Sequence, residues 1–440
     1  MATFSIRSMI NGEFSSATAT AAAEDQGQKV GLRYSMQRVQ RAQVFRASAN
    51  KASLKSSAPA QFAGLRRANL LDIDSNMTVS LTQILSASTV RVSASRAPRC
   101  ATVMSAGAGK KVLMLGGTRF IGTYLARELV NAGYELTLLT RGKKAITSQI
   151  PDDTDDSYAK FAAAVKHIAC DRSDPEAMKA ALTGTGFEIV FDMNGREAVE
   201  AEPILDALPD VKQYIFCSSA GVYKKNDQMP HREEDEVDFN SRHKGKLYTE
   251  QLLDSRGVNW TSVRPVYITG VGNYNQVEEW FFHRIAAGRT IPIPGSGMQV
   301  TQLGNVKDLA TAFMKIIDNP KAARQVYNVA NERFVTFDGI AKACAEAMGV
   351  ECPPIVHYNA KDFDFGKLKA FPMRDQHFFA SVDKAMADLD WTPEYGLVDG
   401  LRDSYEKDFK RGRFIKAADF TTDDMVLEKL GVPAKQAVMA

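Results

Sequence analysis

The stretch KKVLMLGGTRFIG, residues 110–122, decides the fold. A short apolar run, 112–115, leads directly into a glycine-rich turn. The next segment, TYLARELVNAG (123–133), has the period of an amphipathic helix that ends at Gly133. A second apolar run, YELTLLTRG (134–142), follows. This strand–helix–strand order is typical of the beginning of a nucleotide-binding α/β domain.

The alternation of strand and helix patterns continues beyond this unit. Apolar runs occur at 167–170, 188–193, 213–218 and 260–265, and helical patterns separate them at 175–183, 198–207 and 244–256. Such alternation predicts a doubly wound parallel sheet that helices cover on both faces. We therefore expect a Rossmann nucleotide-binding domain over 110–265, a smaller C-terminal α/β lobe over 266–405 and a tail over 406–440.

Residues 1–109 differ in composition from the rest of the chain. They hold 13 Lys and Arg but only five Asp and Glu, and they are rich in Ser, Ala and Thr. This composition is typical of an organellar transit peptide, although a disordered tail that stays attached has the same features. Composition alone does not separate plastid from mitochondrion. Because the whole chain carries only +3, the body after residue 109 is net acidic.

Two classes of protein are excluded by simple counts. No run of 18 apolar residues is present, so the sequence predicts no membrane span. The five cysteines are scattered without a C-x-x-C pair, which argues against a disulfide framework and a structural zinc site. No cluster of metal ligands is visible, and no metal-binding residue is predicted.

The glycine-rich turn is the first candidate binding site. Gly116, Gly117 and Gly122 would let backbone N–H groups approach a pyrophosphate at the N-terminus of the following helix. Arg119 stands where a further glycine would allow the closest approach. Its Cβ narrows the site, whereas its guanidinium is able to pair with phosphate. The competing interpretation is a tight turn that binds nothing.

Two later residues belong to the adenosine end of such a site. Arg141 ends the second strand, where it suits the 2′-phosphate of NADP better than the ribose of NAD. A solvated arginine beside Gly142 is an equal alternative. Asp171, after the third strand, would accept from an adenine amino group or would cap the next helix.

Several motifs in conserved order resemble the extended short-chain dehydrogenases of the epimerase/dehydratase group. They are LGGTRFIG (115–122), CDRSD (170–174), FCSSAGVY (216–223), NVKDLA (305–310) and LDWTPEYGLVDGL (389–401). The resemblance implies a catalytic Ser, and a Tyr four residues before a Lys. Ser219 and Lys246 occupy the serine and lysine places, but Arg242 stands in the tyrosine place. Arginine stays protonated and is no general base, so we expect a vestigial site without hydride transfer.

Basic residues gather around this altered site. They are Lys224, Lys225, His231, Arg232, Arg242, His243, Lys244 and Lys246. A focused positive cleft attracts phosphodiesters, which makes Lys224, Lys225, Arg242, His243 and Lys244 the candidates for binding RNA. The acidic run EEDEVD (233–238) would repel RNA, and a solvated charged surface is the simpler interpretation. The basic run KDFKRGRF (407–414) could also touch RNA, but a solvated helix end is again the simpler interpretation.

A second set of strings resembles a narrower family, the chloroplast stem-loop-binding proteins, and its b-type branch. The strings are GGTRFIG (116–122), FDMNGRE (191–197), CSSAGVYKK (217–225), SRHKGK (241–246) and ADFTTDDMVLEKLG (418–431). The resemblance implies a stromal protein that binds RNA stem-loops, associates with plastid ribosomal particles and acts in chloroplast rRNA or mRNA metabolism. It also implies an endoribonuclease activity assisted by Mg²⁺, and an oligomer of identical chains or with a paralogue.

Two other functions remain open from the residues alone. One is an NADP-dependent epimerase or dehydratase acting on a nucleotide sugar, which the glycine-rich turn and Arg141 favour. The other is a non-catalytic scaffold that keeps a nucleotide and assembles through the helix expected at 244–256.

Overall fold

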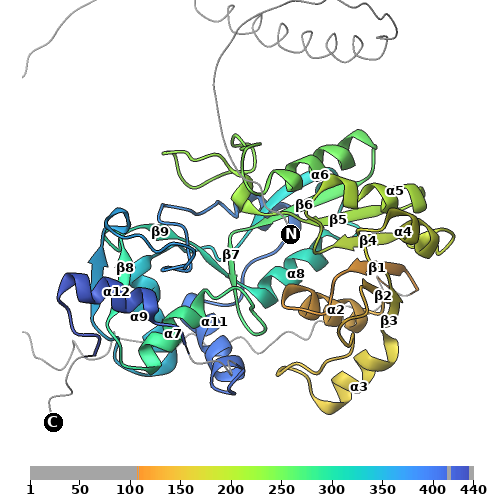
Figure 1. Cartoon of the computed structure of the whole chain (residues 1–440). Coiled ribbons are helices and arrows are strands. Elements are labelled where there is room, and N and C mark those ends of the chain that lie inside the picture. Colours follow the sequence, from red (N-terminus) through yellow and green to blue (C-terminus); the bar gives the residue numbers. More distant parts are fainter. Residues whose placement is uncertain (1–106, 108, 414–417, 436–440) are drawn as a thin grey trace, which may run out of the picture. The chain divides into compact units, whose positions relative to one another are not determined.

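Seven parallel strands form the central sheet of the computed structural model, which describes residues 107, 109–413 and 418–435 (Figure 1). The predicted transit peptide lies outside the described residues. In chain order the strands are β1 (Lys111–Leu115), β2 (Glu135–Thr140), β3 (Lys166–Ala169), β4 (Ile189–Asp192), β5 (Gln213–Cys217), β6 (Trp260–Pro265) and β11 (Gln325–Val329). Their order across the sheet is β11-β6-β5-β4-β1-β2-β3, so the predicted doubly wound parallel sheet is confirmed.

The central strands are apolar throughout because both of their faces are covered. In β1, Val112 and Met114 point into one hydrophobic cluster, whereas Leu113 and Leu115 point into another. This alternation is the period of two expected for a strand, here with apolar side chains on both sides. Strand order reverses between β1 and β4, which places the expected ligand crevice beside the turn that follows β1.

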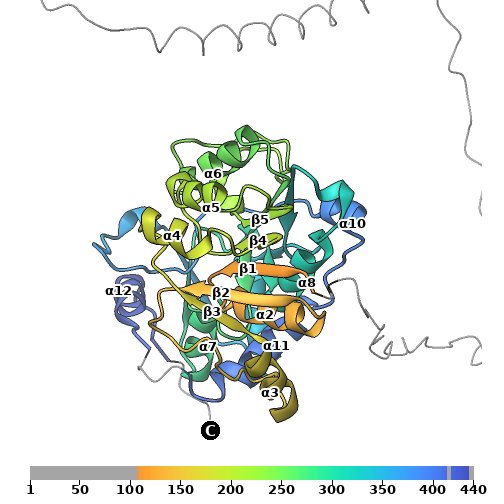
Figure 2. The same cartoon turned by 90° about the vertical axis from the view of Figure 1, so that its right-hand side faces the viewer.

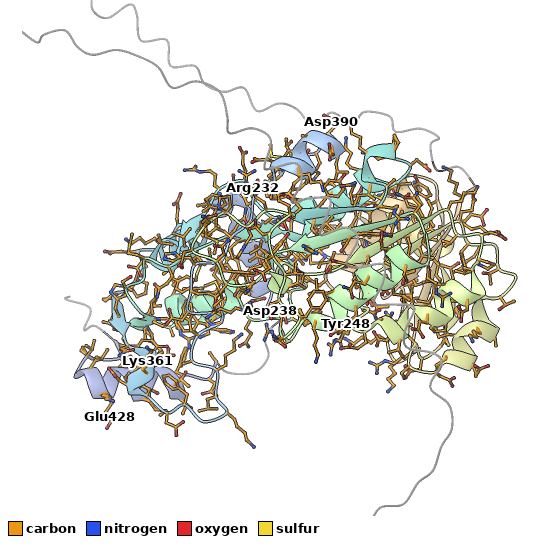
Figure 3. The ribbon with its side chains drawn as sticks, turned by 90° about the horizontal axis from the view of Figure 1, so that it is seen from above. Arg232, Asp238, Tyr248, Lys361, Asp390 and Glu428 are labelled. Carbon is orange, nitrogen blue, oxygen red and sulfur yellow. The ribbon has the colours of Figure 1, made fainter. Side chains whose placement is uncertain are left out.

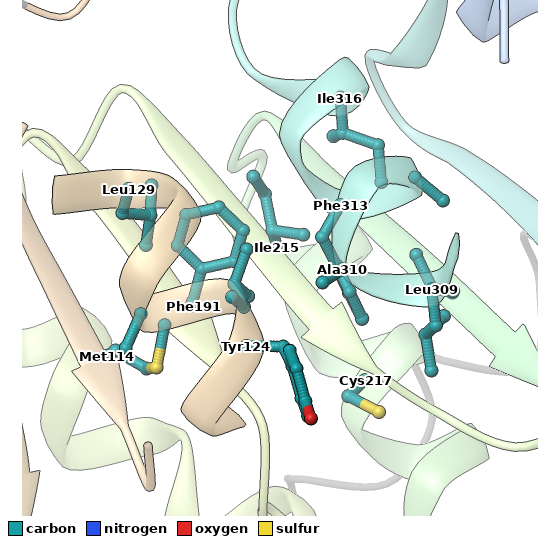
Figure 4. Close-up of a cluster of buried hydrophobic side chains, with 14 of the residues drawn as sticks. Met114, Tyr124, Leu129, Phe191, Ile215, Cys217, Leu309, Ala310, Phe313 and Ile316 are labelled. Carbon is teal, nitrogen blue, oxygen red and sulfur yellow. The ribbon is translucent and has the colours of Figure 1, made fainter. Parts of the chain in front are cut away.

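Helices cover the two faces of the sheet as two separate layers (Figure 2). One layer contains α2 (Ile121–Asn131), α3 (Asp155–Ala164), α8 (Val306–Ile316) and α10 (Asp383–Leu389). The other contains α4 (Pro175–Leu182), α5 (Glu202–Ala207) and α6 (Lys244–Ser255). In the first layer Leu129 of α2 and Phe313 of α8 belong to the same core cluster as Phe191 of the sheet (Figure 4).

The remaining elements build the C-terminal lobe around its own hydrophobic cluster. Its helices are α7 (Glu278–Ala286), α9 (Phe337–Met348), α11 (Leu397–Ser404) and α12 (Thr421–Leu430). Three two-stranded ladders accompany them, formed by β7 (Tyr267–Thr269) with β10 (Leu303–Asn305), β9 (Val300–Thr301) with β12 (Val335–Thr336), and β8 (Ile291–Pro294) with β13 (Ile355–Tyr358). Helix α12 is held by a buried ion pair, Arg284 to Asp423 at 2.6 Å. The segment expected as a tail therefore contributes a packed helix to this lobe.

The range 110–265, expected to form the nucleotide-binding domain, does not include the whole sheet. Strand β11 pairs with β6 from Gln325 to Val329, and α8 packs on α2, so residues 306–329 return to the nucleotide-binding fold. Periodicity shows that a strand exists but not which strand it will pair with. Within the described residues, no helix has the length and apolarity needed to cross a bilayer.

Candidate functional site

The glycine-rich turn after β1 has the backbone geometry that the motif predicts. Gly116 and Gly117 have φ angles of 108° and 88°, in the region that favours glycine. A Cβ on Gly122 would lie 2.7 Å from the Cα of Gly117, so the helix start packs directly on the turn. Phe120 begins α2 without a side-chain cap. These features suit a pyrophosphate at the helix N-terminus, and that role stays a prediction.

Arg119 points away from the turn toward the loop that follows β7. Its guanidinium carbon lies 5.7 Å from the ring centroid of Tyr274, whose ring also meets Phe120 edge-on at 6.2 Å. Tyr274 is 60% exposed, so the pair forms an accessible rim beside the glycine turn. Cation–π contact leaves the guanidinium N–H groups available to a phosphate.

The two residues predicted for the adenosine end lie near one another. Asp171 accepts hydrogen bonds from the backbone and hydroxyl of Ser173, at 3.1 and 2.9 Å, and these lower its pKa. Arg141 lowers the pKa of Asp171 further, which shows that its charge is close. The alternative that Asp171 caps α4 is wrong, because Asp174 accepts from the N–H of Ala177 and takes that place.

Arg172 lies close to the glycine turn, and the sequence analysis did not single it out. It donates to both carboxylate oxygens of Asp192, at 2.7 and 2.9 Å, and to Asn194 at 2.6 Å. Burial raises the pKa of Asp192, but Arg172 more than offsets it and holds that pKa below its usual value. Asn194 lies 3.8 Å from where a Cβ on Gly116 would stand, so this network borders the turn. Arg172 lies within the CDRSD motif, but nothing local indicates its partner on β4.

Ser219 and Lys246, the residues in the predicted serine and lysine places, make hydrogen bonds within the fold. Ser219 accepts from the N–H of Gly221 at 3.1 Å, and the Lys246 ammonium donates to the carbonyl of Cys217 at 2.6 Å. Burial lowers the pKa of Lys246. Arg242 is exposed and donates through Nε to Nε2 of His243 at 3.0 Å. Arg242 therefore leaves the tyrosine place without a hydroxyl group.

The nearby tyrosines do not replace the missing one. Tyr223 is buried and donates to Asn328 at 2.7 Å, and burial raises its pKa to about 12. Tyr248 is on the exposed side of α6, where its ring lies against Phe239. Neither hydroxyl is paired with Lys246.

Five basic side chains meet at the carboxyl edge of β5, and we call them the cationic cluster. Its members are Arg242, His243, Lys246, Lys369 and Arg374. A Cβ built on Gly221 would lie 2.7 Å from the His243 ring and 3.1 Å from Nη2 of Arg374, so both side chains cover the same glycine. Burial, followed by the charge of Arg242, lowers the pKa of Lys369, and Arg242 also lowers the pKa of Arg374 in addition to burial.

The cationic cluster has little anionic compensation. Burial, followed by Arg242, Arg374 and Lys246, lowers the pKa of His243 to about 4, so this imidazole is neutral at physiological pH. Across the ranges described, no carboxylate forms an ion pair with Arg242, Lys369 or Arg374. Cations without carboxylate partners create a local positive potential even on a net acidic body.

Some predicted RNA-binding cations lie elsewhere or are paired. Lys224 forms an ion pair with Glu236 at 2.8 Å, so its charge is compensated. Lys225 and Lys244 are exposed. The expectation that His231 belongs to a basic surface is wrong, because it is 1% exposed and stacks on Tyr223 with centroids 5.0 Å apart. In contrast, Lys369 and Arg374 were missed, since neither lies in a motif and only the fold brings them to β5.

The acidic run 233–238 is largely used within the fold. Glu233 accepts from the backbone of Asn328 at 2.8 Å, and Asp235 accepts from the backbone of Arg232 at 3.0 Å. Among these residues Glu236 pairs with Lys224, whereas Glu233 and Asp235 keep their charges when they accept from backbone N–H groups. The repulsion of nucleic acid expected from this run therefore stands, apart from the charge that Lys224 compensates.

Three of the four basic side chains at 407–413 form ion pairs, and the fourth, Arg411, is exposed. Lys407 pairs with Asp152 and Asp403, Lys410 with Glu406 at 2.9 Å, and Arg413 with Asp408. The paired charges hold the end of α11 to neighbouring elements, as the structural interpretation expected. No group of three or more His, Cys, Asp or Glu side chains in the described part of the chain is arranged to hold a metal ion, so the fold provides no assignable Mg²⁺ site.

Comparison with known proteins identifies relatives at two levels. The sequence profile described as the NAD dependent epimerase/dehydratase family matches residues 112–330. The chain is 60% identical over 332 residues to the chloroplast stem-loop binding protein of 41 kDa b from Arabidopsis thaliana, which covers 76% of this chain and 88% of that protein. That relative is designated chloroplastic, so the predicted chloroplast location is confirmed.

More distant relatives are enzymes of nucleotide-sugar metabolism. UDP-glucose 4-epimerase 3 from Oryza sativa subsp. japonica is 22% identical, covering 68% of this chain and 90% of that protein. The crystal structure of UDP-glucose 4-epimerase from Thermotoga maritima has a TM-score of 0.56 at 20% identity, covering 68% of this chain and 99% of that one. At this level of identity the likeness shows the fold alone, and it confirms the predicted epimerase/dehydratase architecture.

Proposed function

Because the chain belongs to the chloroplast stem-loop binding proteins, in the b-type branch of that family, we propose that it binds RNA stem-loops through the cationic cluster. The observation that carries the proposal is geometric: Arg242 donates to His243 at 3.0 Å, and His243 and Arg374 both cover Gly221, while neither arginine has a carboxylate partner among the described residues. Guanidinium groups match the geometry of phosphate oxygens and bind them by paired hydrogen bonds. Arg242, which stands in the tyrosine place, would thus supply a phosphate-binding group where the resembled enzymes have an acid/base.

The nucleotide groove is a separate part of the proposal. Gly116, Gly117 and Gly122 suit a pyrophosphate, and Arg141 suits the 2′-phosphate of NADP. NADP would supply hydride chemistry when bound. However, Arg242 offers no exchangeable acid or base near neutral pH, and Lys246 is bound to the carbonyl of Cys217. We therefore propose a groove that retains nucleotide binding and rank the NADP-dependent epimerase or dehydratase function second.

Two finer activities are proposed from the resemblance and are tested separately. They are association with plastid ribosomal particles and endonucleolytic cleavage of the bound RNA in chloroplast rRNA or mRNA metabolism. Neither has a residue assigned to it by the geometry of the described ranges, and Mg²⁺ assistance rests on the resemblance. Incubation of a labelled hairpin with the protein, with Mg²⁺ and with EDTA, distinguishes binding without cleavage from metal-assisted cleavage.

The decisive experiment measures binding of a labelled RNA hairpin to the full chain over a salt series, with and without NADP. Binding through phosphate contacts should weaken linearly on a log–log plot, with a slope of about −0.7 to −0.9 per neutralised phosphate. Competition by NADP would locate the RNA close to the nucleotide groove. Absence of hairpin binding at low salt, together with saturable NADP binding, would reject the proposal and favour the oxidoreductase.

A further inference from the structure

An exposed pair of aromatic rings lies beside the cationic cluster. Phe239 is 38% exposed and Tyr248 is 42% exposed, and their ring centroids are 5.7 Å apart with planes tilted by 43°. Tyr248 projects from α6 (Figure 3). Both rings therefore remain partly exposed to solvent in the folded protein, whereas Leu247, the residue before Tyr248, is buried.

Two cations lie close in sequence to this aromatic pair. Lys244 is one helical turn before Tyr248 on α6, which places both on the same face of the helix. Arg242 is three residues after Phe239. Both basic side chains are exposed, and neither forms an ion pair with a carboxylate among the residues described. A ligand of this surface must therefore combine a flat apolar face with negative charge.

An RNA base with its phosphate meets both requirements. A base stacks on an aromatic ring through its π-face, while the adjoining phosphate pairs with Lys or Arg. Bases within a helical stem are already stacked and are hidden from such a ring, whereas bases of a loop are free to unstack.

We infer that Phe239 and Tyr248 form a stacking platform for an unpaired RNA base, so that the protein recognises the loop of a stem-loop by base stacking. This inference rests on the proposed RNA-binding function. The cationic cluster would then hold the backbone, and the platform would discriminate unpaired from paired nucleotides. Stacking is tolerant of base identity because every base has a π-face.

The test compares two hairpins with the same stem and the same number of phosphates. One has an unpaired loop carrying 2-aminopurine, and the other has abasic loop nucleotides. The full chain should bind the intact loop about tenfold more tightly than the abasic loop and should quench 2-aminopurine fluorescence. Tyr248→Ala and Phe239→Ala should each remove most of this difference without changing affinity for the abasic hairpin.

Two matched variants control for loss of the fold and for non-specific aromatic contact. Tyr248→Phe retains the ring and should bind like the original protein. Phe334→Ala removes an exposed ring that is also paired, with Phe379 at 4.4 Å, but in another segment, and should change nothing.

Three results would overturn the inference, and they are distinguishable. Equal binding of the intact and abasic hairpins by the unmodified protein would reject the platform but leave RNA binding standing. A change of oligomeric state in Tyr248→Ala, with the base dependence retained, would assign the rings to a protein contact. Binding of neither hairpin would reject the proposed function itself.

Discussion

Arg242 is the residue that most changes what this site is able to do. A tyrosine at this place would offer an exchangeable proton to a substrate, whereas a guanidinium keeps its charge at every physiological pH. The side chain donates to His243, and its charge lowers the pKa values of Lys369 and Arg374. A single substitution thus adds a permanent cation to a site where other cations already lie.

Removing a charge from the cationic cluster should weaken RNA binding. We expect Arg374→Gln and Arg242→Gln each to lower hairpin affinity about tenfold and to reduce the magnitude of the salt slope by about one. Fluorescence anisotropy over a salt series measures both quantities. Lys224→Gln is the matched control, because Glu236 already compensates that charge, and it should change affinity less than twofold. An equal loss in Lys224→Gln would indicate general charge attraction in place of a defined site.

The affinity for RNA should also depend on pH through His243. Its pKa in the free protein is about 4, since burial and the neighbouring cations Arg242, Arg374 and Lys246 oppose protonation. A bound phosphate favours the protonated ring and raises that pKa, so binding takes up a proton. Affinity should therefore rise as the pH falls from about 7.5 to about 5. His243→Gln should flatten this dependence in the same titration, and a pH profile identical in both proteins would contradict the assignment.

At the scale of elements, a polar network joins the loop after β3 to the ends of β4 and β5, although β1 and β2 lie between β3 and β4 in the sheet. The loop after β3 supplies Arg172, and β4 ends in Asp192, whose carboxylate also accepts from the hydroxyl of Tyr214 on β5 at 3.0 Å. The carboxylate is completely buried. A buried ion pair of this kind fixes the positions of its loops, and removal of one partner leaves a charge without compensation.

Asp192→Asn should therefore destabilise the fold strongly. We expect the free energy of unfolding to fall by about 3 kcal/mol, because the buried Arg172 charge would keep only its longer ion pair with Glu200, at 3.6 Å. Urea denaturation followed by circular dichroism measures this change. The control is Glu135→Gln, which removes an exposed ion pair with Lys166 at 3.1 Å and should cost less than about 0.5 kcal/mol. Equal losses of unfolding free energy in the two variants would contradict this expectation, because they would show that water readily solvates the Arg172 charge.

At the scale of the whole molecule, the chain crosses between its two lobes more than once. The sheet is completed by β11, and the face of α2 is covered by α8, although both elements follow the first strands of the C-terminal lobe. Leu309, Phe313 and Ile316 of α8 are buried in the core cluster that Phe191 of the sheet also enters (Figure 4). The two lobes are therefore interdependent in folding.

A fragment limited to residues 110–265 should not fold cooperatively. It would expose the edge of β6 and the apolar face of α2, and both lose large areas of apolar contact. A fragment of residues 107–435 is the control and should show a single cooperative urea transition by circular dichroism. Cooperative folding of the 110–265 fragment on its own would instead support the domain boundary predicted from the sequence.

The local structure of this protein was determined largely by its sequence. The strand expected at 260–265 is β6 over Trp260–Pro265, and the helix expected at 244–256 is α6 over Lys244–Ser255. Periodicity, glycine and capping residues act between neighbours in the chain, so these elements can be inferred without the fold. The glycine turn and the arginine in place of the catalytic tyrosine were visible for the same reason.

Only the tertiary structure decided which charges act together. It brought Lys369 and Arg374 to Arg242, placed Arg172 against Asp192, paired Lys224 with Glu236 and buried His231. It also added β11 to the sheet. These partners are far apart in sequence or on different elements, and their meeting depends on strand order and lobe packing. Local composition contains no information on such distances, and electrostatic interaction depends steeply on them.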